Sequence, residues 1–413
     1  MHRRSFIALL GAGCVDPSPM VGTAAGLFDT PAALSPEGQF QAWLADYRGR
    51  AVLGPIPAAV LDRELAGLVS DPRVAALDSR QPEFSKPVGD YIKGVVSADR
   101  VAIGQRKRAE LAYLSAIEQR FGVPPEIVLG IWAMESGFGA ILGDFDVVRS
   151  LATLAGAGRR RDFAESQLTA ALSIIASGEF PRARLTGSWA GAMGQTQFIP
   201  TSFLSSAVDG DGDGRRDVWA SSADALASAA NLLARGGWTR GQGWAREVTA
   251  PPGFDFSLTE GPRQSANAWS GLGIRRADGL PWSRLDLAGD AILIAPSGAA
   301  GPLFLLFPNH FAIRSYNNST AYALGVGLLA DRFAGMEPLV TPWPYEAPLS
   351  LADRVAAQSA LAALGFEVGA PDGVVGVATR SALRAWQKSR SLVADGYLSP
   401  DMVRRLKAEA NIA

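Results

Sequence analysis

The stretch "PPEIVLGIWAMESGFG", residues 124–139, begins with two prolines, continues as an apolar run and ends in glycines that surround one carboxylate, Glu135. Proline is tolerated in the first turn of a helix, and glycine commonly ends one, so the stretch predicts a helix from about Pro124 to Gly137. At helical spacing Glu135 falls on the same face as Ile127 and Ile131. The sequence therefore predicts an apolar helix that points a carboxylate inward.

Such a position has consequences for the acidity of Glu135. Burial and the negative end of the helix dipole both penalise the ionised form, so we expect a raised pKa. A carboxylic acid of this kind can stay protonated near neutral pH and give its proton to a leaving group. The alternatives are that Glu135 lies on the surface at a frayed helix end, or that it pairs with a buried arginine. Periodicity alone leaves these interpretations open.

Composition excludes several classes of function. The 413 residues carry 39 lysines and arginines against 40 aspartates and glutamates, so no basic field exists that would attract nucleic acid. Only His2 and His310 are histidines, which excludes a histidine-based zinc site or catalytic triad. Cys14 is the only cysteine, so no intrachain disulfide can form. We expect a monomer without an organic cofactor.

The N-terminus has the layout of an export signal, with Arg3 and Arg4 before a short apolar run. The arginine pair resembles a twin-arginine signal, and Gly13 before Cys14 resembles the end of a lipoprotein signal, in which Cys14 would be acylated and attach the protein to the outer membrane. An ordinary secretory signal cleaved near "GTAAG", residues 22–26, is the third interpretation. All three place the mature protein outside the cytoplasm, in the periplasm or beyond.

The pattern of apolar residues predicts a mainly α fold with some β structure. Helical spacing dominates from residue 40 to about 336, whereas "AILIAPSG" and "PLFLLFPNHFAI" within residues 251–311 read as strands of a small insertion. The proline-rich "MEPLVTPWPYEAPLS" from residue 336 predicts a stiff linker, and three short helical patterns follow it. The predicted organisation is an export signal with its linker at 1–30, a catalytic domain at 31–340, a linker at 341–350 and a small three-helix domain at 351–413.

Two further segments combine polar and small residues. "GSWAGAMGQTQFIP", residues 187–200, offers Ser188 and Gln197 among glycines, which would allow a bulky hydroxylated ligand to approach the backbone closely. "RSYNNSTAYALGVGLL" from residue 314 offers Tyr316, Asn317 and Tyr322, which could stack on a sugar and hydrogen-bond to it. The alternatives are a helix-packing loop for the first segment and helix capping for the second.

Together with the helix of Glu135 and the upstream "QPEFSKPVGDYI", these segments closely resemble the lytic murein transglycosylases of the membrane-bound B type over residues 40–336. The resemblance implies a lysozyme-like helical catalytic domain in which Glu135 is the single acid and base. It also implies that peptidoglycan glycan strands are the substrate. The substrate-binding residues that it implies are Ser188, Gln197, Tyr316, Asn317, Tyr322, and for the peptide part of the substrate Arg159 and Arg160.

The reaction that the resemblance implies is cleavage between N-acetylmuramic acid and N-acetylglucosamine to give a 1,6-anhydromuramyl end. Glu135 would protonate the glycosidic oxygen and then deprotonate the muramyl C6 hydroxyl, so water is not consumed. Hydrolytic glycosidases use two carboxylates, and Asp144 or Asp146 could supply the second. A hydrolytic muramidase therefore stays open as an alternative, as does a wall-binding scaffold protein without turnover.

The acidic stretch "DGDGDGRRDVWA", residues 209–220, matches an EF-hand calcium loop in its first nine positions. Its sixth position is Gly214, but Ala220 stands where a bidentate glutamate is expected, and the resemblance implies that Asp224 takes that part. The alternative is a solvated acidic turn before a helix, and a calcium-responsive regulator is a third reading. We expect a structural Ca²⁺ in the loop 209–224, with magnesium or sodium as alternatives and with these ligands: Asp209, Asp211, Asp213, Arg215, Asp217 and Asp224.

The last sixty residues are similar to the small helical peptidoglycan-binding domains of wall-active enzymes. The resemblance rests on Leu364-Gly365-Phe366, on the Asp-Gly pairs at 372 and 395, and on the helix that ends near Trp386. The residues themselves predict only a compact three-helix unit; wall binding is what the resemblance implies. A wall-binding module tethered to a catalytic domain would raise the local concentration of substrate.

Overall fold

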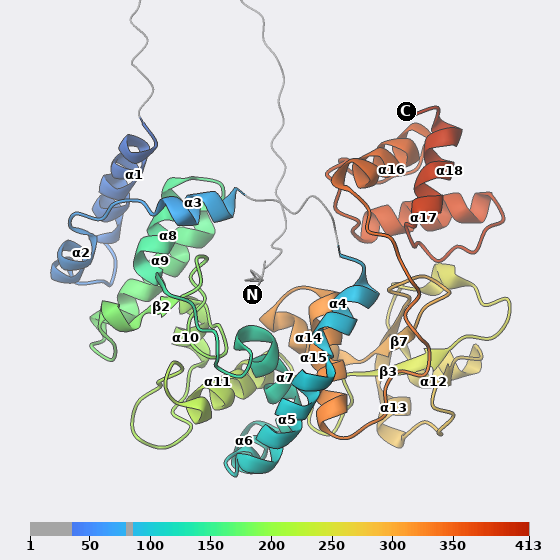
Figure 1. Ribbon diagram of the computed structural model, residues 1–413, viewed down its shortest axis with the longest axis horizontal. Coiled ribbons are helices and arrows are strands. Elements are labelled where there is room, and N and C mark those ends of the chain that lie inside the picture. The colour runs from blue at the N-terminus through green and yellow to red at the C-terminus, as the bar shows by residue number, and fades with distance from the viewer. Residues whose placement is uncertain (1–34, 80–85, 413) are drawn as a thin grey trace, which may run out of the picture. The chain divides into compact units, whose positions relative to one another are not determined.

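The computed structural model describes residues 35–79 and 86–412, which form two compact units (Figure 1). The first unit contains the described residues up to 79, Gly139–Ala225 and Asn317–Ser319. The second contains the described residues from 86 to Phe138, Leu226–Tyr316 and the chain from Thr320 onward. The predicted export signal with Arg3, Arg4 and Cys14 lies outside the described residues. Among the described residues, no helix is both long enough and apolar enough to cross a membrane.

The first unit is built around two buried helices, α8 (Val147–Gly156) and α9 (Arg161–Ala176), which pack against each other. Almost every side chain of α8 is buried because its sequence alternates aliphatic and small residues on all sides. The other elements of this unit surround the pair; they are α1 (Pro36–Ala51), α2 (Ala58–Leu65), α3 (Pro72–Asp78), β1 (Phe145–Asp146), η1 (Arg182–Arg184), β2 (Thr186–Gly187) and α10 (Pro200–Ser206).

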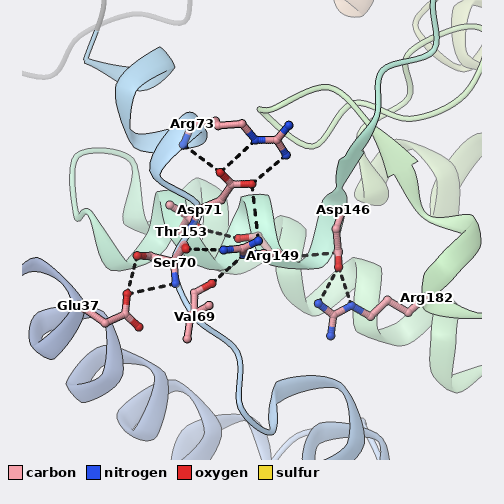
Figure 2. A network of polar contacts seen from close by, with 9 residues as sticks. All are labelled: Glu37, Val69, Ser70, Asp71, Arg73, Asp146, Arg149, Thr153 and Arg182. Atoms are coloured by element: carbon pink, nitrogen blue, oxygen red, sulfur yellow. Dashed lines mark hydrogen bonds and ion pairs between the residues drawn. The ribbon is translucent and has the colours of Figure 1, made fainter.

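A polar network fixes the segment before α3 onto α8, as Figure 2 shows. Arg149 on α8 donates to the backbone oxygens of Val69 at 2.9 Å and Ser70 at 2.7 Å. The backbone N–H of Asp71 donates to the hydroxyl of Thr153, one turn further along α8, at 2.9 Å. These hydrogen bonds satisfy backbone N–H and carbonyl groups of residues 69–71, which belong to no helix. They thereby fix the segment from which α3 begins.

The second unit has α7 (Pro125–Ser136) and α15 (Thr320–Phe333) at its centre. The two helices can approach closely because Gly130 has no side chain. A Cβ at this position would lie only 2.8 Å from the carbonyl oxygen of Val326. The remaining helices of this part are α4 (Val88–Val95), α5 (Ala98–Glu110), α6 (Leu114–Phe121) and α14 (Pro308–Tyr316), and α11 (Ser222–Arg235) contributes to both units.

The predicted β insertion is a five-stranded antiparallel sheet of order β4-β6-β7-β3-β5, packed around the buried Trp269. It begins with β3, before the predicted start at residue 251, and the predicted strand over residues 302–313 ends early because Pro308 opens α14. The elements are β3 (Ala245–Thr249), η2 (Phe256–Leu258), β4 (Gln264–Ser265), α12 (Ala266–Gly271), β5 (Arg275–Arg276), α13 (Arg284–Ala288), β6 (Asp290–Ile294) and β7 (Leu303–Leu306).

The C-terminal part consists of α16 (Leu351–Ala363), α17 (Val377–Ser389) and α18 (Pro400–Ala410) around a core that includes Trp386. Ser350 and Asp353 form a reciprocal capping box that starts the first of these helices. The three helices lie where the sequence predicts them.

Candidate active site

The helix α7 ends as its sequence predicts, immediately beyond Glu135. Gly137 adopts a left-handed conformation with φ of 59°, and the backbone N–H of Phe138 returns to the carbonyl oxygen of Trp132 at 3.1 Å. The four residues before Glu135 and the one after it are buried, whereas Glu135 itself is partly exposed. The helix therefore embeds Glu135 among buried neighbours near its C-terminal end.

The carboxyl group of Glu135 holds its proton more tightly than an ordinary glutamate. Burial raises its pKa from 4.5 to about 7, against the opposing effect of a hydrogen bond from Tyr322. The phenol of Tyr322 donates to Oε1 of Glu135 at 2.5 Å. At neutral pH Glu135 is therefore protonated in a large fraction of the molecules. When it loses its proton, the hydroxyl of Tyr322 stabilises the carboxylate.

Tyr91 also belongs to the surroundings of Glu135, and Tyr316 to those of Tyr322. Burial, followed by the charge of Glu135, raises the pKa of Tyr91 to about 12. Burial also raises the pKa of Tyr322, with further contributions from Glu135 and then from Tyr316. Tyr91 was not among the residues singled out from the sequence, although it lies within the upstream segment quoted for the family resemblance. Its place in that segment is the only feature of the sequence that points to Tyr91 as a site residue.

The segment 187–200 is a tight loop in which the glycines meet other parts of the protein. A Cβ at Gly187 would lie 2.0 Å from the carbonyl oxygen of Ala192, and one at Gly191 would lie 2.6 Å from Leu151. Gly143, which precedes the loop, packs on it, because a Cβ there would lie 2.1 Å from the carbonyl oxygen of Gly187. The backbone N–H of Ser188 donates to the oxygen of Ala192 at 2.7 Å, and its hydroxyl accepts from the N–H of Ala192 at 3.0 Å. Internal packing thus accounts for these glycines, and they are no evidence for close approach of a sugar.

Gln197 has a left-handed backbone, with φ of 51°, which is uncommon for a residue other than glycine. Its side-chain amide donates to the carbonyl oxygens of Gly194 at 2.9 Å and Leu142 at 3.2 Å. Both of these hydrogen bonds use the amide nitrogen of Gln197. The amide oxygen takes part in neither, and amide oxygens readily accept hydrogen bonds from hydroxyl groups. Gln195, by contrast, is buried and donates to the oxygen of Trp219, so its role is structural.

Arg159 and Arg160 both bind one buried carboxylate, that of Asp78, at 3.0 Å. The guanidinium of Arg160 also lies over the ring of Trp189, 5.4 Å from its centroid. Arg159 remains half exposed. The first unit therefore holds two arginines on one carboxylate, and one of them, Arg160, lies beside the aromatic ring that directly follows Ser188.

Asp146, a candidate second carboxylate, is engaged within the first unit. One oxygen caps α8 by accepting from the N–H of Arg149 at 3.1 Å, and the other pairs with Arg182 at 2.7 Å, as the right side of Figure 2 shows. Both oxygens of this carboxylate are thus already engaged in contacts within the protein. These contacts argue against a general-base role for Asp146.

The acidic loop brings three carboxylates together. Asp209, Asp211 and Asp213 each offer an oxygen within 4.8 Å of the others, and Gly214 has φ of 89° at the sharp turn. The buried Asp224 accepts instead from the backbone N–H groups of Gly210 at 2.8 Å and of Asp217 at 2.7 Å. The donor set of three hard oxygens fits a Ca²⁺ ion, and Asp224 ties the loop to α11.

The other two predicted metal ligands have different surroundings. The carboxylate of Asp217 pairs with Arg184 at 2.9 Å and accepts from the N–H of Ala220 at 2.9 Å. Arg215 would contribute only its backbone oxygen at the seventh position of an EF-hand loop.

Asn317 and Tyr316 follow one another at the end of α14. The carbonyl oxygen of Asn317 accepts from the N–H of Ser319 at 2.6 Å, which forms the turn into α15. Of the predicted residues, the structure thus brings Tyr322 into contact with Glu135 and places Tyr316 in the electrostatic surroundings of Tyr322. Asn317 and the remaining ones, Ser188, Gln197, Arg159 and Arg160, belong to the first unit.

Comparison with protein families identifies the class. A family model described as a transglycosylase SLT domain matches residues 39–331, which is more than half of the chain. A model described as a peptidoglycan binding domain matches residues 350–406. The chain belongs to the transglycosylase SLT family.

Three relatives make the assignment more specific. The SltB3 structure from Pseudomonas aeruginosa, solved with NAG-anhNAM-pentapeptide, is 46% identical, covers 89% of this chain and 99% of its own, and has a TM-score of 0.85. Slt35 from Escherichia coli, solved with calcium, is 27% identical, covers 71% of this chain and 92% of its own, and has a TM-score of 0.60. The membrane-bound lytic murein transglycosylase B of Escherichia coli K12 is 32% identical over 224 residues, which are 52% of this chain and 58% of that protein. The predicted family and the mainly helical catalytic fold are confirmed.

Proposed function

We propose that this protein is a lytic transglycosylase that cleaves the bond between N-acetylmuramic acid and N-acetylglucosamine in peptidoglycan, with Glu135 as its acid and base. The observation that carries the proposal is the carboxyl group of Glu135, which has a pKa of about 7 through burial and a phenol donor at 2.5 Å. An acid whose pKa lies near the working pH can both give and take a proton. The relatives named lytic transglycosylases support the reaction class.

Each step follows from the one carboxyl group. Glu135 gives its proton to the glycosidic oxygen while the bond from that oxygen to the muramyl C1 breaks. The carboxylate that results is stabilised by the hydroxyl of Tyr322, which already donates to it. It then takes the proton of the C6 hydroxyl as that oxygen bonds to C1, which closes the 1,6-anhydro ring. Glu135 ends protonated, and no water enters the product.

The hydrolytic alternative requires a second carboxylate as base or nucleophile. Asp146 is occupied by Arg182 and by the cap of α8, which leaves it poorly suited to either role. The relative SltB3 was solved with a ligand that contains an anhydro sugar, which is the product type of the non-hydrolytic route. We therefore favour the route without water.

The test of Glu135 is its isosteric replacement. Glu135→Gln keeps the shape and an acceptor for Tyr322 but cannot give or take a proton, so release of soluble fragments from peptidoglycan sacculi should fall at least a thousandfold, on the order of what general acid–base catalysis contributes. Glu126→Gln, on the first turn of the same helix, is the matched control and should retain activity. Retained activity in Glu135→Gln, with an unchanged circular dichroism spectrum, would contradict the assignment.

The other predicted residues fit roles in substrate binding. Ser188, Gln197, Tyr316 and Asn317 supply hydroxyl and amide groups suited to sugar hydroxyls and acetamido groups. Arg159, half exposed and steadied by Asp78 together with Arg160, would meet a carboxylate of the peptide. The wall-binding domain would add affinity for the same polymer.

A substrate of this kind also requires export of the protein, through one of the signals expected in residues 1–30. Acylation of Cys14 is a further proposal.

A structural calcium ion in the acidic loop is the second proposal. Asp209, Asp211 and Asp213 would hold it, because three converging carboxylates repel one another unless a cation compensates their charge. The relative Slt35 was solved in complex with calcium. The ion would stabilise the loop between α10 and α11 and take no part in the proton transfers.

Thermal unfolding tests the calcium site. Ca²⁺ at about a hundredfold above its dissociation constant should stabilise the fold by about 2.7 kcal/mol, and a chelator should reverse the effect. Asp213→Asn should remove most of the calcium-dependent rise in melting temperature, whereas Asp290→Asn, an exposed aspartate on β6, should not. An unchanged melting temperature with calcium in the wild-type protein would contradict the proposal.

A further inference from the structure

The C-terminal domain contacts the sheet insertion through one unusual residue, Glu260. Its carboxylate receives Arg380 at 2.7 Å and Arg384 at 2.5 Å, both from α17. The side chains of Glu260 and Arg384 are 19% and 10% exposed, so these two charges are largely withdrawn from water, whereas Arg380 is 32% exposed. Ion pairs at exposed sites contribute little, but a partly buried carboxylate shared by two guanidinium groups is costly to separate.

The backbone of Glu260 supports the view that this side chain is required. Its φ is 59°, in the left-handed region that favours glycine, and its N–H is fixed by the carbonyl oxygen of Leu293 at 2.8 Å. A residue other than glycine in this conformation costs free energy, and it persists where the side chain has a task. Although burial opposes ionisation, Arg380 and Arg384 hold the pKa of Glu260 below its usual value, so the charge persists at neutral pH.

A second contact joins the loop between β6 and β7 to the same domain. The N–H of Ala299 donates to Asp395 at 3.0 Å, and the other oxygen of Asp395 accepts from Gln387 at 2.9 Å. Gly298 permits this approach, because a Cβ there would lie 2.5 Å from Asp395 and 2.9 Å from Tyr397. The turn that shapes the C-terminal domain is thus also a docking contact.

The proline-rich segment between the domains is itself attached to the insertion. Glu247 on β3 accepts from the backbone N–H groups of Val340 at 2.8 Å and Thr341 at 2.7 Å. Trp343 stacks on Phe304 with 6.2 Å between ring centroids. A segment held at its backbone and by an aromatic side chain does not act as a freely moving spacer.

We propose that the peptidoglycan-binding domain is docked on the sheet insertion through Glu260, so that the wall-binding module is held at a fixed position relative to Glu135 within the second unit. This differs from a tethered module, which raises the local concentration of substrate without selecting an orientation. A docked module presents the wall polymer to the enzyme in one orientation. The inference concerns the arrangement of the chain and holds or fails independently of the activity.

The test is a distance distribution between two spin labels in the full chain. Arg106→Cys on α5 and Glu367→Cys after α16 place labels at two exposed sites of the second unit, in a Cys14→Ser background. Pulsed electron resonance should give one narrow distance for the otherwise native chain. Glu260→Arg places three positive charges next to one another, and their repulsion should broaden the distance distribution. Adding Arg384→Glu should make the distribution narrow again to a large extent. Glu260→Gln, which keeps the size of the side chain, should broaden it less.

The matched control is Asp401→Arg, because Asp401 also binds two arginines, Arg404 and Arg405, but within the single helix α18. Reversing the charge of Asp401 should leave the distance distribution narrow. A broad distribution in the native chain would overturn the proposal, as would a narrow and unchanged distribution in both Glu260 variants. Circular dichroism establishes that each variant is folded.

Discussion

At the scale of the residue, Glu135 obtains its acidity from its place on α7 and from Tyr322. Helical periodicity alone predicts that the carboxyl group points inward and has a raised pKa, which the structure gives as about 7. The hydrogen bond from Tyr322 could not be predicted in that way, because 187 residues separate the partners. The resemblance to the family supplied Tyr322 as a substrate-binding residue, but not as the partner of the acid.

The raised pKa of Glu135 links stability to pH. Its carboxyl group prefers the proton in the folded state, so its favourable contribution is complete below pH 4.5 and is lost as the pH rises through about 7. Glu135→Gln escapes that loss. At pH 8 the variant should be more stable than the native protein by roughly 1–3 kcal/mol, and below pH 4.5 the difference should vanish, as urea unfolding at several pH values would measure. A constant difference at all pH values would contradict the raised pKa.

Tyr322→Phe should show what the phenol does for the acid. Without its donor the carboxylate is less stable, so the pKa of Glu135 should rise further and the high-pH limb of the rate profile should move to higher pH. The turnover number should fall about ten- to a hundredfold, as expected for the loss of one hydrogen bond to a charged group. Tyr345→Phe, at an almost wholly exposed tyrosine, is the control. An unchanged profile in Tyr322→Phe would mean that this contact plays no part in proton transfer.

At the scale of the element, glycines decide how the loop 187–200 folds. Gly143→Ala would place a Cβ 2.1 Å from the backbone oxygen of Gly187 and would also strain a backbone with φ of 86°. Gly178→Ala has a similar φ of 77° but meets nothing within 4 Å, so it isolates the strain from the clash. We expect Gly178→Ala to cost about 1 kcal/mol and Gly143→Ala at least about 3 kcal/mol in urea unfolding. Equal losses would show that the close approach is unimportant.

The helices were largely predictable from sequence, and the boundaries of the sheet insertion were not. Helices such as α9 and α11 follow directly from apolar residues three and four apart. The run from Pro302 to Ile313 is apolar except for Asn309 and His310 and satisfies either periodicity, so the change from β7 to α14 at Pro308 could not be predicted from it. The packing of Gly191 against Leu151 could not be predicted either, because the two residues are distant in sequence.

At the scale of the whole molecule, the order of domains follows from composition, but the attachment of the last one does not. A proline-rich linker and a three-helix unit are readable from residue types. The ion pairs that fix that unit join Glu260 to arginines at least 120 residues away, and no local pattern reports them. The docking proposed here therefore rests on the structure alone.

The measurement that tests the central claim most directly is mass spectrometry of the soluble products released from peptidoglycan sacculi in ¹⁸O-labelled water. If Glu135 works alone and the C6 hydroxyl is the nucleophile, the products should be one water lighter than their hydrolytic counterparts and should carry no label at the muramyl C1. The same products should be absent with Glu135→Gln. Products that carry one labelled oxygen at C1 would contradict the account and would show that a second group activates water.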